Sequence, residues 1–199
     1  QFDRMIEQTG GDSNAATWVD WTYYRDSVPA RDLALVVELE AARMTNLAIE
    51  PAVLESEREV VANERMQRVD DEVEGFADEE LARLAFTVHP YGWPTIGWME
   101  DIRSMALDDV LRFYRTYYAP NNATLVVVGD VDEARLLDLV ERHYGGIAPA
   151  EMPAERAVVE PPQAGERRQR FTKPTPAPRL LRGYRAVGQD HPDWPALSF

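Results

Sequence analysis

A long helical stretch begins at Pro51 and carries two glutamates on one side, and it limits the possible folds of this chain more than any other segment does. Proline is favoured in the first turn of a helix, and no further glycine or proline follows it until after residue 70. Glu57 and Glu64 are seven residues apart, or about two turns, so their side chains lie within roughly 20° of each other around the helix. Two valines lie between them. A face that mixes valines with acids predicts carboxylates at the edge of a core, where they need a cation, a metal or a proton.

The same spacing is also compatible with an ordinary surface helix. The stretch contains further acids, and Arg58, Arg65 and Arg68 can pair with several of them at i,i+3 or i,i+4 spacing. Spacing alone leaves both interpretations open, so a second segment is needed to choose between them.

That second segment runs from Gly10 to Tyr24 and combines a double-glycine turn with aromatic and β-branched residues. A helical pattern at Phe2, Met5 and Ile6 precedes it, and the glycines are expected to end that helix. The residues after the glycines are predicted to form a strand.

Together, the two segments resemble the pitrilysin/insulinase family of zinc peptidases, the inverted zincins. The family pattern is Gly-Gly-x-x-Asn-Ala-x-Thr, an aromatic strand, two helices and then Glu-Arg-x-x-Val-x-x-Glu. This chain has each element in that order, and the resemblance covers residues 1 to about 150. It implies an α+β fold of two layers, in which helices pack on one face of a mixed, mostly antiparallel β-sheet.

One part of the family pattern is absent from this chain. The family carries two zinc-binding histidines and a general-base glutamate in H-x-x-E-H on one helix, whereas His89, His143 and His191 lie far apart in the sequence. The family motif lies upstream of the double glycine, so we expect it before residue 1, in a longer protein of which this chain is a piece. The general base is then outside this chain, and His89 is predicted to be a structural residue in a loop.

The resemblance implies roles for four residues. Glu64 would be the third zinc ligand, and Glu57 would support the site by orienting a histidine or balancing its charge. Asn14 and Ala15 match positions on an edge strand that pairs with the extended backbone of a peptide substrate. An ordinary turn residue after the glycines is the alternative for Asn14. Zinc is expected in the longer protein and is expected to be absent from, or incompletely bound by, this chain alone.

The implied function is that of a zinc-dependent metalloendopeptidase, of which this chain would be an inactive portion. The alternative is a non-catalytic interaction or scaffold subunit of the same fold in a peptidase heterodimer. The expected partners are a peptide substrate, the remaining parts of the same protein, and a second subunit in a homo- or heterodimer.

Composition excludes some classes of function and leaves others open. A net charge of −14 disfavours nucleic acid as a partner, because its binding needs a basic face. No apolar run is long enough to span a bilayer. Arginine greatly outnumbers lysine, as in GC-rich bacterial genes. We expect a bacterial periplasm or cell-envelope location, with the cytoplasm as the alternative.

Domain boundaries are predicted from a change in composition after Ile147, where prolines become frequent. We predict a first peptidase domain over 1–148, an interdomain linker over 149–178, and the start of a second, similar domain over 179–199. The continuous apolar run 123–130 is predicted to be a buried strand. Another strand is predicted at 180–186, with its apolar residues left without a partner in their own domain.

Further helices are predicted from apolar periodicity at 33–46, 73–86, 99–102, 107–114 and 133–143. Asp130 and Asp132 precede the last of these and are expected to cap it.

Overall fold

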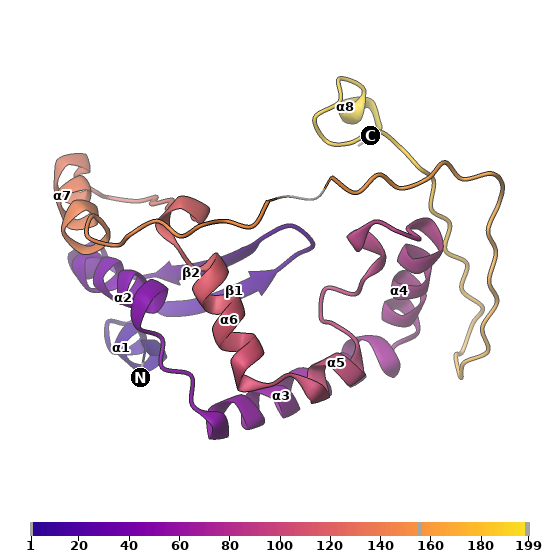
Figure 1. Ribbon diagram of the computed structural model, residues 1–199, viewed down its shortest axis with the longest axis horizontal. Coiled ribbons are helices and arrows are strands. Elements are labelled where there is room, and N and C mark those ends of the chain that lie inside the picture. Colours follow the sequence, from indigo (N-terminus) through magenta and orange to yellow (C-terminus); the bar gives the residue numbers. More distant parts are fainter. Residues whose placement is uncertain (1, 155–156, 198–199) are drawn as a thin grey trace. The chain divides into compact units, whose positions relative to one another are not determined.

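The computed structural model describes residues 2–154 and 157–197 (Figure 1). The helices and strands, in chain order, are α1 (Phe2–Gln8), β1 (Asp12–Thr17), β2 (Thr22–Ser27), α2 (Leu33–Asn46), α3 (Pro51–Arg65), α4 (Val73–Ala85), α5 (Met99–Ser104), α6 (Leu107–Tyr117), α7 (Glu133–Tyr144) and α8 (Trp194–Leu197). A π-helical turn, Met66–Asp70, follows α3 directly. Within the described residues the sheet consists of two antiparallel strands, so the predicted α+β class is confirmed.

The described residues fall into two compact units. The first lies within 1–59 and 103–156, and the second within 60–102 and 157–199. The chain passes from the first unit into the second within α3, after Glu59. The predicted domain boundaries at 148 and 178 stay predictions.

A β-hairpin follows the double glycine in the first unit (Figure 1). Gly10 takes a positive φ of 81°, which glycine adopts without strain, and ends α1. The register pairs Asp12 with Ser27 and Thr17 with Thr22. A single strand was expected over this segment, but it divides into two around the loop 18–21. That loop has no Asn-Gly or similar turn signature, so its sequence does not predict a hairpin.

The core of the first unit is built by helices whose apolar stripes follow the predicted periodicity. The buried side chains are those of Ile6, Val37, Ala41, Ala119 and Leu139. They come from α1, α2 and α7 and from the turn after α6. The predicted helices 33–46 and 133–143 are therefore confirmed, and the Asp132 side chain caps α7 by accepting a hydrogen bond from the Arg135 N–H at 2.8 Å.

The prediction of a buried strand at 123–130 is wrong. This segment is extended but pairs with no strand among the described residues, and the side chains of Val126 and Val128 are 73% and 90% exposed. A strand needs a neighbour to satisfy its N–H and C=O groups. The apolar run therefore has the composition of a strand, but no partner strand lies beside it within the described residues.

In the second unit, the proline-rich segment after residue 157 lies against α4 and its neighbours. The rings of Phe171 and Phe76 meet edge to face, with centroids 4.9 Å apart. Arg167 donates to the Leu84 carbonyl at 2.6 Å, and Arg185 donates to the Ala85 carbonyl at 2.8 Å. These carbonyls belong to the last turn of α4, where backbone acceptors lack helical partners and cations are favourable.

The strand predicted at 180–186 is also not formed within the described residues. Leu180 and Tyr184 are 72% and 82% exposed, as expected for apolar residues without a partner. Across the described ranges, no helix is both long enough and apolar enough to cross a membrane.

Candidate functional site

The predicted acidic face lies on one continuous helix. Glu57 and Glu64 both belong to α3, so the helical spacing inferred from the sequence is confirmed. Glu57 is exposed. Its neighbour Arg58 donates to the carbonyl oxygens of Arg103 at 3.3 Å and Met105 at 3.0 Å, which attaches this turn of α3 to the end of α5 and the residue that follows it.

Glu64 is only partly satisfied. Its side chain is 39% exposed, and its Oε1 accepts an ion pair from Arg68, one turn further along, at 2.9 Å. Arg68 is itself 76% exposed, so this pair is solvated and contributes little to stability. A carboxylate with a single weak partner has the donor chemistry of one zinc ligand.

The next residue has the opposite environment. Arg65 is buried, and its guanidinium contacts Glu79 through two hydrogen bonds of 2.9 and 3.0 Å. It also donates to the Gly97 carbonyl at 2.7 Å. The hydrogen bond to Glu79 raises the pKa of Arg65, so this residue is charged throughout the accessible pH range.

Asn14 and Ala15 lie in β1, opposite Arg25 and Tyr24 of β2, and both side chains are exposed. The side chain of Asn14 accepts a hydrogen bond from the Ala15 N–H at 2.8 Å. Its position inside a strand excludes the turn role considered as an alternative. Because β2 is the strand that pairs with β1 in the described sheet, the other side of β1 is an edge.

A complete metal site does not fit within the described residues. They contain no cluster of three or more His, Cys, Asp or Glu side chains placed to hold a metal ion. His89 is structural, as predicted, because its Nδ1 accepts a hydrogen bond from the Tyr91 N–H at 3.2 Å. Within the part of the chain that the structure describes, Glu64 therefore belongs to no such cluster, and its role as a ligand stays a prediction.

Sequence reasoning missed Glu160, which lies in the segment predicted to be a linker. Its side chain is only 6% exposed and accepts hydrogen bonds from the backbone N–H groups of Thr87, Val88 and His89, each at 2.8 Å. The Thr87 hydroxyl donates to it at 2.7 Å, and Arg185 lies 3.3 Å away. Burial alone would raise the pKa of Glu160, but these hydrogen bonds hold it well below its usual range.

A second cluster that the sequence did not reveal surrounds Glu40 in the first unit. Its side chain is 18% exposed and lies 3.1 Å from the Arg43 guanidinium. Burial and a hydrogen bond with Asp26 raise the pKa of Glu40 to about 8. Burial also raises the pKa of the nearby Tyr144 to about 12, and the acids add to that rise. Neither acid stands in a motif, so the sequence offered no signal for their proximity.

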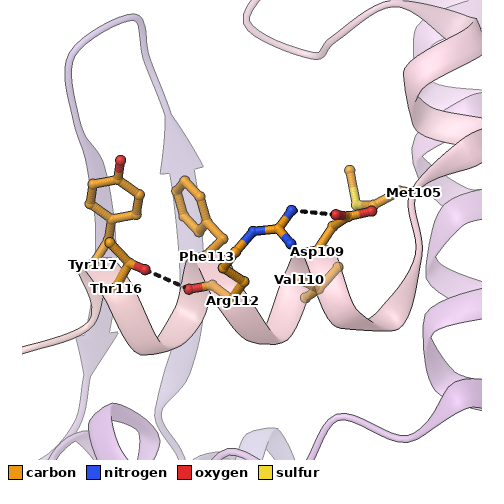
Figure 2. Close-up of a pocket in the computed structure, with 7 residues that line it drawn as sticks. All are labelled: Met105, Asp109, Val110, Arg112, Phe113, Thr116 and Tyr117. Carbon is orange, nitrogen blue, oxygen red and sulfur yellow. Dashed lines mark hydrogen bonds and ion pairs between the residues drawn. The ribbon is translucent and has the colours of Figure 1, made fainter. Parts of the chain in front are cut away.

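An open hollow of about 630 Å³ lies along α6 (Figure 2). It is lined by Met105, Asp109, Val110, Arg112, Phe113, Thr116 and Tyr117. Figure 2 shows the Phe113 and Tyr117 rings close together, with centroids 4.7 Å apart. None of the four predicted site residues lines this hollow, so it is not the predicted active site.

Family models match nearly the whole chain. The model described as Insulinase (Peptidase family M16) matches residues 1–97, and the model described as Peptidase M16 inactive domain matches residues 104–199. Both models describe peptidase family M16.

The chain belongs to the insulinase family. This confirms the resemblance read from Glu57, Glu64 and the double-glycine segment.

Individual relatives agree with this assignment. The zinc protease PqqE of Helicobacter pylori is 36% identical over 144 residues, which are 72% of this chain and 32% of that protein. The crystal structure of a protease from Helicobacter pylori matches with a TM-score of 0.75 and 33% identity, covering 80% of this chain and 38% of that one. The periplasmic protease PqqL from Escherichia coli has a TM-score of 0.70 at 21% identity, covering 80% and 18% of the two chains, and shares the fold.

The chain of this insulinase-family protein spans about a third of the length of the curated relatives it matches. The relatives named as zinc proteases connect the family with zinc and with peptide hydrolysis.

Proposed function

We propose that this chain is a portion of a zinc-dependent metalloendopeptidase, to which it contributes Glu64 as the third zinc ligand. The observation that carries the proposal is the contrast within one turn of α3. Glu64 has a solvated partner and a partly exposed carboxylate, whereas the buried Arg65 guanidinium beside it donates hydrogen bonds to Glu79 and to the Gly97 carbonyl. The remaining ligands and the general base would come from residues outside this chain.

The bound metal would lower the pKa of a water molecule and polarise the scissile carbonyl. Glu57 would act from the same helix as a supporting carboxylate, oriented by the attachment of Arg58 to the end of α5 and the residue that follows it. With one ligand and no general base, the chain alone is not expected to hydrolyse peptides.

The hairpin would bind the substrate. The free edge of β1 at Asn14 and Ala15 offers main-chain groups to an extended peptide, which would bind by strand addition. The small side chain of Ala15 permits a close approach of the two backbones. This mode of binding selects for extended conformation more than for particular side chains.

Zinc content tests the proposal. In the full-length protein, Glu64→Gln is expected to lose stoichiometric zinc, measured by metal analysis after dialysis. Glu59→Gln is the matched control, because Glu59 is an exposed acid on the same helix, about 140° away from Glu64. Full zinc retention in Glu64→Gln would remove Glu64 from the ligand set.

The second candidate function is a non-catalytic interaction subunit of a peptidase heterodimer. The match of residues 104–199 to a model described as an inactive domain supports it. Presence of H-x-x-E-H upstream of residue 1 in the gene would favour the peptidase, and its loss would favour the subunit. The proposed compartment is the bacterial periplasm or cell envelope, with the cytoplasm as the alternative.

A further inference from the structure

Three segments of the second unit meet at the guanidinium of Arg65. Glu79 comes from α4, Gly97 from the turn before α5, and Asp70 from the end of the π-helical turn, with its Oδ1 3.5 Å from Arg65 Nη2. The side chains of Arg65 and Glu79 are 7% and 10% exposed. Such a paired, two-bond contact between arginine and a carboxylate fixes direction as well as distance.

This contact lies where α3 would otherwise be loosely held. The α-helical geometry ends at Arg65, and the π-helical turn begins at Met66. Helix ends fray unless side chains or packing hold them. Only Ala62 and Arg65 are buried in α3, so the inward face of its last turn depends on these two residues.

Fixing Arg65 also fixes Glu64. Glu64 and Arg65 are consecutive residues of one helical turn, about 100° apart around the axis. A rotation of that turn that released Arg65 would therefore also turn the Glu64 carboxylate away from its position. A metal ligand must be held to within about 0.5 Å of its working position. The exposed pair between Glu64 and Arg68 is too weak to supply that restraint.

We propose that Arg65 is a positioning residue, whose contacts with Glu79 and the Gly97 carbonyl set the direction of the Glu64 carboxylate toward the metal. The inference rests on the proposed role of Glu64. It assigns to Arg65 and Glu79 no contact with substrate or metal. Their effect reaches the site only through the orientation of the end of α3.

The test uses Arg65→Lys and Glu79→Gln in the full-length protein. Lysine keeps the charge but cannot make the two-bond contact, and glutamine keeps the shape of Glu79 without its charge. Each variant is expected to raise the zinc Kd about 10-fold or more, as loss of a partner behind a metal ligand typically does, measured by competition with a chromophoric chelator. The double variant is expected to lose no more affinity than the single ones, because both remove the same contact.

Two readouts separate positioning from general stability. The visible absorption of the Co²⁺-substituted protein is expected to change in both variants, and amide hydrogen exchange of residues 60–68 in the metal-free protein is expected to quicken. The control is Arg142→Lys, which alters an exposed i,i+4 pair with Asp138 on α7 and should leave zinc affinity, absorption and exchange unchanged.

The outcomes are distinct. If Glu64→Gln loses zinc while Arg65→Lys and Glu79→Gln retain wild-type affinity and absorption, the positioning role is overturned and the ligand role stands. If Glu64→Gln retains zinc, the proposed function itself fails. If both positioning variants fail to fold, Arg65 is a stabilising residue and the inference is likewise overturned.

Discussion

Two glutamates in the second unit show how differently a carboxylate can be placed. Glu64, in the last turn of α3, has one solvated arginine as partner and is 39% exposed. Glu160, in the proline-rich segment, is 6% exposed and receives hydrogen bonds from three consecutive backbone N–H groups and a hydroxyl. Glu160 has its hydrogen-bonding capacity filled by the protein, whereas Glu64 has capacity left for a ligand.

The acid with the more perturbed pKa is therefore not the better candidate for a functional residue. The more strongly held acid is the structural one, although its pKa is the more perturbed. Structural hydrogen-bond networks also perturb pKa values, and the hydrogen bonds that lower the pKa of Glu160 all come from the protein itself. The partly satisfied acid next to a rigid neighbour is the better candidate for binding a metal.

The largest expected effect on stability comes from Glu160→Gln. The amide cannot accept from all four donors and brings N–H groups toward N–H groups, so the segment 157–160 should detach from 87–89. The thermal midpoint of the metal-free protein, followed by circular dichroism, is expected to fall by several degrees. Glu166→Gln is the matched control in the same segment, since Glu166 has one exposed partner, Arg168. An equal midpoint in the two variants would show that the contacts of Glu160 are not stabilising.

The hydrogen bonds of Glu160 should also make the stability of the protein depend on pH in the acidic range. The pKa of Glu160 is lowered in the folded protein, so its stabilising contribution is complete above the unfolded pKa of about 4.3 and is lost as the pH falls through the folded value. Between pH 7 and pH 3, the wild-type midpoint is expected to fall more steeply than that of Glu160→Gln. Parallel slopes would contradict this assignment.

Glu40 is a third acid with a different environment. It is largely buried, and it has too few hydrogen-bonding partners to stabilise its charged form. Because its pKa is raised to about 8 in the folded state, the protein is expected to lose stability as the pH rises from about 4.5 through 8. Glu40→Gln cannot ionise, so it should flatten this loss and unfold at a higher temperature than wild type at pH 9. Melting curves at pH 5, 7 and 9 test it, and an unchanged pH dependence would exclude Glu40 as its source.

The smallest effect on stability is expected at Glu64. Glu64→Gln removes one solvated ion pair, so the free energy of unfolding without metal should change by no more than ~0.5 kcal/mol. Denaturant unfolding in the presence of a chelator measures this. A large loss of stability would place Glu64 with Glu160 among the structural acids and remove the contrast.

The helices were predictable because their signals are local. Residues 33–46 carry an apolar stripe, and the prediction matches α2 at both ends. Asp132 was expected to cap the helix that follows it and does so. The spacing of Glu57 and Glu64 required only that α3 be helical.

The strands were less predictable because a strand depends on its partner. The run 123–130 has the stronger apolar pattern, yet the less apolar Asp12–Thr17 forms a strand because the chain turns back to pair with it. Pairing across a loop without a turn signature leaves little trace in the sequence.

The contacts of Glu160 could not have been predicted for a different reason. Its partners are mostly backbone amides, which every residue except proline possesses, so no residue type marks them. Arg65 is similar in part, because its bond to the Gly97 carbonyl has no side-chain signal. The family pattern drew attention to Glu64 on α3, but not to the contacts that Arg65 beside it makes with Glu79 and the Gly97 carbonyl.

The attachment of Glu160 has a practical consequence for anyone dividing this protein into pieces. The change in composition near residue 148 invites a cut there, but such a cut would take away the acceptor for three adjacent amides at 87–89 and the cations at the last turn of α4. A trimmed version would keep the helices that are easiest to recognise while exposing the groups that the removed tail had covered. Any cut that preserves the second unit has to keep residues 157–185 with it.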